Sequence, residues 1–432
     1  MYEQKSKVAK QATGQENTVR DTPVLVLDKA AIERIILILT LECQSPNSGI
    51  QSFFEVICGI NVSAGRISSV IKEAAQRAQA YDDTIDLSGI SQMAIDEIFQ
   101  CGKPILTGVD PVSTYNFLLE EAADRTADTW AIYLEDRKDK GLNPETSIND
   151  GGTGLMAGLP QVFPDIEIQA DTFHALQGMG KEVQKLERAA YKLISGEAGL
   201  KEKLAGKRPR AKHNESLAGI QAKMDGAIKM YDSIYILFAW LQALLNFSGY
   251  SLADTRILAE WVLSEMELLA AGNPGYIKEV VKIRKILPGL LSFIGRLERG
   301  MRETAEKTGI PVDVFKHMYQ QMAFSPDSPH GIESHCKLAM QLGEKYTEAQ
   351  NEFNLLLDTT KKASSMVENL NGRIRVFIEV KRVIPTSFFV LLKVFFNTRK
   401  YRRSRYAARK GKSPLELLTN TSQPDFLEAL GY

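Results

Sequence analysis

The chain has 432 residues, and its 53 Lys and Arg balance its 53 Asp and Glu, so its formal net charge is zero. Hydrophobic residues make up 44 % and charged residues 25 %, which excludes a disordered tail, a collagen and a disulfide-rich secreted module. At about 150 residues per domain, the length predicts two to four domains.

Three features favour a cytoplasmic protein. Residues 1–22 are polar and contain no apolar signal-peptide core. The four cysteines are scattered with no CxxC pair, so we expect neither a disulfide framework nor a zinc site. The longest apolar stretch, Ile234 to Phe247, is too short to cross a membrane and predicts a buried helix.

The first 80 residues have a helical pattern from Lys29 to Ala78. A helix over about Ile50–Ile57 is expected to end near Gly59, and Ser63 is placed to cap the next helix. Helix, short turn and helix form the outline of a helix-turn-helix. The second helix would then present to a DNA major groove Arg66, Ser68, Ser69 and Lys72. A pair of short helices with no DNA partner is the alternative.

The next segment, up to residue 171, predicts the order β-β-β-α-β-α-β. Met93–Phe99 and Ile105–Asp110 are expected to form a hairpin. Asn116–Ala123 is either a third strand or the start of a helix. A helix over Thr126–Lys140 precedes two short strands, of which the second is Ile166–Asp171.

Two aspartates in this segment are candidates for chemistry. Asp96 interrupts a strand with a buried pattern, where an ionised carboxylate needs a partner or a metal. Its neighbour Glu97 must point to the opposite face of the strand. Asp150 follows a strand and precedes Gly151, at the sheet edge where ligand sites of α/β proteins collect. The alternatives are an acid that reaches water at a strand edge and an ordinary Asp-Gly turn.

Three more residues carry weaker signals. Asp171 and His174 are three residues apart, just past a strand, and Glu368 lies at the start of an amphipathic helix. A satisfied structural histidine and an acid that answers the helix dipole are the alternatives. No two of the five histidines have HExxH spacing, and the chain has no GxSxG elbow and no complete phosphate loop. These absences disfavour zinc enzymes, serine hydrolases and nucleotide-hydrolysing enzymes.

The second half of the chain is almost entirely helical over residues 175–360. Two more helices follow, and then a basic run from Arg399 to Lys412 with eight Lys and Arg and no acid. Such a run suits phosphate contacts, although a solvated surface is the alternative. The candidate DNA contacts in it are Arg399, Lys400, Arg402, Arg403 and Arg405.

Taken together, these segments resemble a bacterial insertion-sequence transposase of the DDE type, in the mutator-like group with a ribonuclease-H-like core. The resemblance runs from about Ile32 to Tyr432 and rests on the order of six short motifs. These motifs are Ala94–Phe99, Gly108–Pro111, Ile148–Gly152, Asp171–His174, Ala363–Asn371 and Gly411–Leu418.

The resemblance implies an α/β plus all-α fold in four parts. A helix-turn-helix domain occupies residues 1–80, and the first part of a ribonuclease-H-like mixed sheet core occupies 81–175. An all-α insertion over 176–360 splits that core. Residues 361–432 complete it with the helix of the catalytic glutamate and the basic segment.

The resemblance also assigns roles. Asp96 on the first core strand, Asp150 after the fourth and Glu368 behind the insertion match the three catalytic acids, which bind two Mg²⁺ or Mn²⁺ ions. Asp171 and His174 match an accessory signature. The implied function is metal-dependent cleavage and transfer of DNA strands, with double-stranded DNA (terminal inverted repeats and target) as the partner. A homodimer stays open, and the nucleoid is the expected location on DNA.

The alternative function is that of a DNA-binding protein without catalysis, either a regulator or a degenerate transposase. The distribution of charge fits DNA in both cases. Residues 81–171 hold 5 Lys and Arg against 18 Asp and Glu, whereas residues 361–412 hold 15 against 2. The zero total therefore hides an acidic segment and a basic one.

Overall fold

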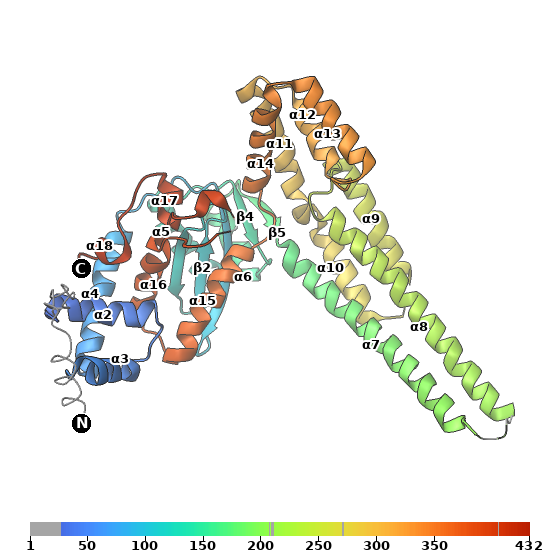
Figure 1. Cartoon of the computed structure of the whole chain (residues 1–432), viewed down its shortest axis with the longest axis horizontal. Helices are drawn as coiled ribbons and strands as arrows, with labels where there is room; N and C mark the ends of the chain where they lie inside the picture. The colour runs from blue at the N-terminus through green and yellow to red at the C-terminus, as the bar shows by residue number, and fades with distance from the viewer. Residues whose placement is uncertain (1–26, 207, 209–210, 270–271, 405) are drawn as a thin grey trace, which may run out of the picture. The chain divides into compact units, whose positions relative to one another are not determined.

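The computed structural model describes residues 27–432 except 207, 209–210, 270–271 and 405 (Figure 1). Two compact units divide the chain, namely residues 1–71 with Tyr432, and residues 72–431. The described part is mixed α and β, with one five-stranded sheet and a large helical block. The expected combination of an α/β part and an all-α part is therefore confirmed.

The first unit is helical. Its elements are α2 (Lys29–Leu41), α3 (Asn47–Phe53), a π-helical turn (Phe54–Cys58) and the beginning of α4 (Ala64–Asp82). The turn ends at Gly59, whose φ of 68° is the left-handed conformation that glycine adopts easily. The Ser63 hydroxyl accepts a hydrogen bond from the Arg66 N–H at 3.1 Å, as a capping residue does. The predicted cap is confirmed, and the helix-turn-helix assignment stays a prediction.

The sheet combines a meander with two parallel strands. Its members are β1 (Gln92–Gln100), β2 (Lys103–Val109), β3 (Asn116–Glu121), β4 (Thr146–Asn149) and β5 (Glu167–Ala170). They lie in the order β3-β2-β1-β4-β5, with β1–β2 and β2–β3 antiparallel and the other pairs parallel. Helices α5 (Ala127–Asp139) and α6 (Thr153–Val162) connect β3 to β4 and β4 to β5. The predicted order is confirmed, and Asn116 begins a strand.

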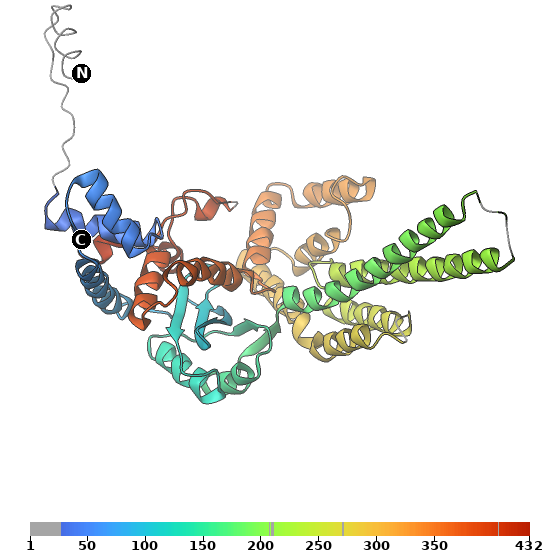
Figure 2. The same ribbon diagram turned by 90° about the horizontal axis from the view of Figure 1, so that it is seen from below.

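Each face of the sheet packs against a different pair of helices. Ile95 of β1 packs into one core with Trp130 of α5 and Leu159 of α6. Helix α15 (Ser365–Lys381) contacts β1 and β2, and α16 (Thr386–Thr398) contacts β3. Figure 2 shows α5 and α6 on one side of the strands, and α15 and α16 on the other. Because successive strand residues point to opposite faces, Asp96 and Ile95 face different helices.

The helical block runs from α7 to α14 and leaves and rejoins the sheet at one place. Its helices are α7 (Thr172–Leu204), α8 (Ala211–Leu244), α9 (Leu252–Leu269), α10 (Pro274–Leu290), α11 (Ser292–Thr308), α12 (Val312–Gln321), α13 (Pro329–Leu342) and α14 (Lys345–Thr359). The Thr172 hydroxyl donates to the Lys362 carbonyl at 2.6 Å. The chain therefore enters and leaves the helical block at neighbouring positions beside the sheet, which is compatible with the predicted insertion.

The C-terminal segment follows the insertion. After α15 and α16 it forms a 3₁₀ turn (Ala407–Arg409), α17 (Pro414–Thr419) and α18 (Phe426–Ala429). Ser413 and Glu416 form a capping box at the start of α17. Among the described residues, no helix combines the length and the apolar character that crossing a membrane requires.

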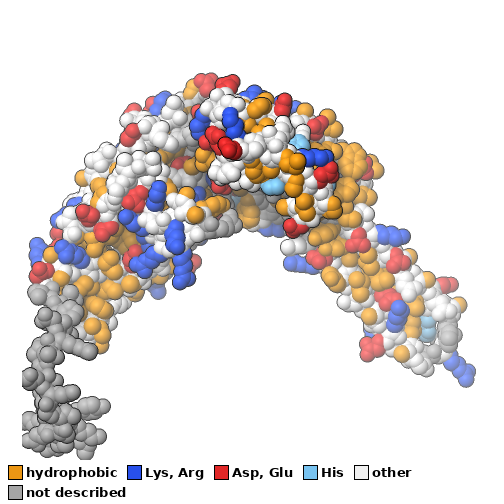
Figure 3. Space-filling view, turned by 45° about the horizontal axis from the view of Figure 1, so that its top comes forward, with side chains coloured by type: hydrophobic (Ala, Val, Ile, Leu, Met, Phe, Trp, Pro, Cys, Tyr) orange, Lys and Arg blue, Asp and Glu red, His pale blue; other side chains and the backbone are white. Residues whose placement is uncertain are grey.

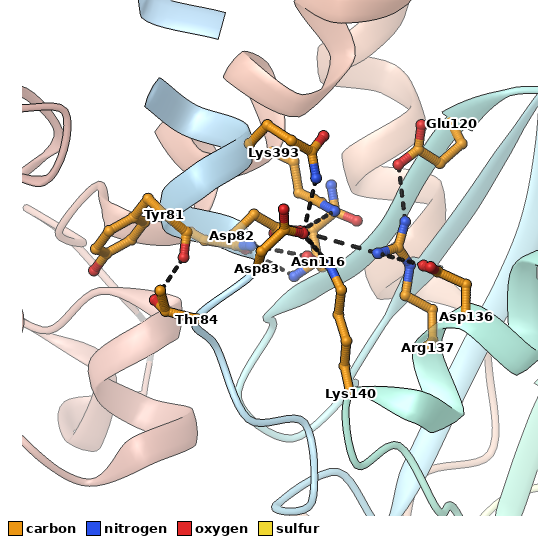
Figure 4. A network of polar contacts seen from close by, with 12 residues as sticks. Tyr81, Asp82, Asp83, Thr84, Asn116, Glu120, Asp136, Arg137, Lys140 and Lys393 are labelled. Carbon is orange, nitrogen blue, oxygen red and sulfur yellow. Dashed lines mark hydrogen bonds and ion pairs between the residues drawn. The ribbon is translucent and has the colours of Figure 1, made fainter. Parts of the chain in front are cut away.

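A buried ionic cluster joins α4, β3, α5 and α16 in the second unit (Figure 4). The Lys393 ammonium lies 2.8 Å from a carboxylate oxygen of Asp82, and both side chains are almost fully buried. Lys140 contacts the same oxygen at 3.3 Å, and Arg137 pairs with Glu120 at 2.8 Å. Burial lowers the pKa of Lys393, and the charge of Asp82 opposes that shift. We name these five residues the buried ionic cluster.

Candidate metal-binding and DNA-binding site

Asp96 points toward α15, as the alternation of strand residues predicts. Its carboxylate accepts a hydrogen bond from the Asn371 amide at 2.7 Å. Glu97 faces the other way and pairs with Arg125 at 2.6 Å, close to the beginning of α5. The strand therefore separates one acid that faces α15 from one that is neutralised by a cation.

Asp150 is exposed directly after β4, in a turn that its own sequence stabilises. The Gly151 N–H donates to the Asn149 side chain, and the Gly152 N–H donates to the Asp150 carboxylate, both at 3.0 Å. Gly151 has a φ of 84°, which a residue with a side chain rarely adopts. The two interpretations of Asp150, an ordinary Asp-Gly turn and an acid at the end of a strand, therefore both apply. The turn holds the carboxylate at the edge of the sheet.

Asp171 is buried and caps α7, and its carboxylate has three donors. The Phe173 N–H donates at 2.7 Å, the Ser364 hydroxyl donates from the segment before α15, and His174 Nδ1 lies 2.7 Å away. The other ring nitrogen of His174 lies 3.3 Å from a carboxylate oxygen of Glu368. A chain of contacts therefore runs from Asp171 through His174 to Glu368 and joins both ends of the insertion.

The charges of these acids act on one another. The pKa of Asp96 is raised to about 7, mainly by burial and in part by the charges of Asp150 and Glu368, while a backbone hydrogen bond from Glu97 opposes the shift. Burial lowers the pKa of His174, but the hydrogen bond with Asp171 and the charges of Asp171 and Glu368 leave it raised. The charges of Asp96, Asp150 and Glu368 therefore act on one another. We name these acids, together with Asp171, His174 and the side chains that contact them, the acid neighbourhood.

The donor chemistry of this neighbourhood fits a hard divalent cation. Carboxylate oxygens are the ligands that Mg²⁺ and Mn²⁺ prefer, and a cation would stabilise the ionised form of Asp96, which burial and neighbouring acids disfavour. The Asn371 amide oxygen is buried with no hydrogen-bond partner. Over the described ranges, however, no three His, Cys, Asp or Glu side chains come close enough to hold a metal ion.

The predicted DNA contacts divide into two groups. On α4, Ser68, Ser69 and Lys72 are exposed, but Arg66 forms an ion pair with Glu33. After α16, Arg399, Lys400, Arg402 and Arg403 are exposed. Lys400 pairs with Glu416 at 3.1 Å. Arg405 lies outside the described residues.

Sequence reasoning missed two residues of the acid neighbourhood, Asn371 and Ser364. Asn371 is three residues after Glu368, so both fall on one face of a helix, and this spacing could have identified it. Ser364 carries no such signal, because its contact with Asp171 depends on the place where the insertion ends. Comparison with known protein families and with curated proteins finds no match for this chain.

Proposed function

We propose that the chain is a DDE transposase with a ribonuclease-H-like core, which binds the ends of a mobile element and cleaves and transfers DNA strands. The observation that carries the proposal is geometric: helix α15 contacts Asp96 through Asn371 at 2.7 Å and carries Glu368, which lies 3.3 Å from His174. Asp96 is on the first strand, Asp150 directly follows the fourth, and Glu368 is on a helix beyond the insertion. This is the order that the family resemblance implies.

Asp96, Asp150 and Glu368 would hold Mg²⁺ or Mn²⁺. When bound, two such ions activate an attacking oxygen and stabilise a leaving oxygen in an in-line displacement. The neighbours of the acids have positioning roles. Asn371 orients Asp96, and His174, itself held by buried Asp171, orients Glu368. Water would attack the phosphodiester at the element end, and the 3′-hydroxyl so released would attack the target DNA.

DNA binding would involve both basic regions. The order of α3, turn and α4 supports a helix-turn-helix, and the exposed Ser68, Ser69 and Lys72 are its candidate major-groove contacts. The exposed cations after α16 would contact phosphates, which give affinity but little sequence information. A transposase must bind both the end of its element and target DNA of arbitrary sequence. The major-groove contacts would serve the first, and the phosphate contacts would serve both.

The test is single substitution of the acids. With a supercoiled plasmid that carries the gene and its native flanking DNA, Asp96→Ala, Asp150→Ala and Glu368→Ala should each reduce strand cleavage by about 10³-fold or more. DNA binding should remain measurable. The exposed Asp165→Ala is the matched control and should cleave like the native chain. Full cleavage by Asp150→Ala would reject the proposal.

A DNA-binding protein without catalysis is the second candidate. The observation that favours it is the lack, over the described residues, of three ligands close enough for one metal ion. It predicts salt-dependent DNA binding and no metal-dependent cleavage by the native chain. Isothermal titration calorimetry with Mn²⁺ in the absence of DNA separates the two functions. A transposase must bind Mn²⁺, and Asp96→Asn must abolish that binding, whereas a DNA-binding protein without catalysis has no such requirement.

A further inference from the structure

A basic pocket of about 280 Å³ lies between α15 and the segment after α16. Its lining includes five cationic residues and no acid. The cations are Arg373, Arg399, Lys400, Arg402 and Arg403. Figure 3 shows Lys and Arg side chains gathered on part of the face in view. One of the five cations, Lys400, pairs at 3.1 Å with Glu416, which lies outside the lining. A concave surface lined mainly by cations favours an anionic ligand.

Helix α15 joins the basic pocket to the acid neighbourhood. Glu368 and Asn371 contact His174 and Asp96, whereas Asn369 and Arg373 line the pocket. Residues four apart share a helix face, so Asn369 and Arg373 present one donor surface. Consecutive residues of a helix point in different directions, so the basic pocket and the Glu368 side chain lie on neighbouring faces of α15.

The basic pocket has a defined scaffold. The guanidinium of Arg373 lies over the Phe396 ring, 3.9 Å from its centre, which restricts the orientation of the cation. The following loop is closed by two backbone hydrogen bonds of 2.9 Å between Tyr401 and the 411–412 segment. The Tyr401 hydroxyl also lies 2.6 Å from the Thr114 hydroxyl, next to the sheet. The loop that carries Arg402 and Arg403 is therefore anchored at its base.

We propose that the basic pocket binds a backbone phosphate of a DNA strand and so positions neighbouring phosphates at the acids. This inference rests on the proposed function, because it takes DNA as the substrate. Planar guanidinium groups such as that of Arg373 match phosphate oxygens in paired hydrogen bonds. The half-buried ring of Tyr401 offers surface to the attached sugar or base, whereas Phe396 is buried beneath Arg373. Recognition of this kind does not depend on base sequence.

The experiment uses the full chain, a fluorescein-labelled DNA duplex of arbitrary sequence and EDTA, so that binding is measured without cleavage. Anisotropy over a range of KCl concentrations gives the affinity and its salt slope. Arg373→Gln and Arg403→Gln should each weaken binding about tenfold and reduce the slope by about 1. The matched control is Arg375→Gln, an exposed cation on the same helix outside the pocket, which should behave like the native chain.

Two further arms make the result decisive. Arg373→Lys should recover most of the salt slope, which separates loss of charge from misfolding of α15. Inorganic phosphate should compete no better than chloride at equal ionic strength if the pocket requires a strand. Competition by millimolar phosphate would instead identify a free-anion site and overturn the proposal.

Failure of the basic pocket and failure of the proposed function are distinguishable. If Arg373→Gln binds DNA with the affinity and salt slope of the native chain, the pocket does not bind a DNA phosphate, even if cleavage depends on Asp150. Cleavage by Asp150→Ala would reject the transposase mechanism, whereas a reduced slope in Arg373→Gln would still establish the phosphate contact.

Discussion

Asp96 of the acid neighbourhood and Asp82 of the buried ionic cluster are carboxylates withdrawn from water, partly for Asp96 and almost fully for Asp82, but they differ in what surrounds the charge. Asp96 has acids, Asp150 and Glu368, as its charged neighbours, and burial with their repulsion raises its pKa to about 7. Asp82 has Lys393 and Lys140 against its carboxylate. A buried carboxylate paired with cations is compensated, and removing one of those cations destabilises the fold. A buried carboxylate among other acids destabilises the fold unless a metal ion binds.

The largest stability effect is expected in the buried ionic cluster. Lys393→Met should lower the free energy of unfolding by about 3 kcal/mol, since it leaves Asp82 with fewer cations in a buried place. The control Lys337→Met removes an exposed pair with Glu333 and should cost less than about 0.5 kcal/mol. Urea unfolding measures both. Equal urea midpoints for Lys393→Met and Lys337→Met would show that the buried pair with Asp82 stabilises the fold no more than an exposed pair does.

A divalent cation should stabilise the folded chain by binding to the acid neighbourhood and not to the buried ionic cluster. At pH 8, Mg²⁺ or Mn²⁺ at about 100 times its dissociation constant should add about 2.7 kcal/mol to the folded state, because it binds the native acids and not the unfolded chain. Thermal melting with and without EDTA checks this. The same additions to Asp96→Asn should shift the melting temperature little. Equal shifts in the variant and the native chain would place the cation elsewhere.

Asp96→Asn should stabilise the chain at high pH. The folded pKa of about 7 exceeds the ordinary value of 3.8, so the folded protein retains a proton that the unfolded chain has released. Stability is therefore lost as the pH rises from about 4 to 7. Without a cation, the variant should gain about 1–2 kcal/mol at pH 8 and nothing at pH 4. Parallel pH profiles for the variant and the native chain would exclude a buried, repelled Asp96.

His174 should give the smallest effect. Its raised pKa means that its contacts with Asp171 and Glu368 add stability that is present below about pH 6.5 and lost as the pH rises through the folded pKa. His174→Gln should cost less than about 1 kcal/mol at pH 6 and little at pH 9, because the ring is one-third exposed. His317→Gln, at a histidine hydrogen-bonded to Ser334, is the control. A loss of equal size at both pH values would show that His174 acts by packing.

Much of the fold was predictable from local pattern. The hairpin of β1 and β2, the alternation of helix and strand up to β5 and the helical character of 175–360 follow from periodicity and turn residues. Gly309 and Gly343 nevertheless end helices that the pattern alone does not divide. A glycine inside a helical pattern is tolerated, so periodicity cannot distinguish a cap from an interior residue.

The sequence by itself determined the succession of helices and strands along the chain up to β5, the opposite directions of Asp96 and Glu97 and the turn that holds Asp150, because these depend on residues close in the chain. Only the tertiary structure decided that Asp96 meets Asn371, that Ser364 meets Asp171 and that Lys393 meets Asp82. Each of these pairs lies far apart in the chain. Their contacts exist because the sheet packs against helices that return after a long insertion, and no local periodicity encodes that return.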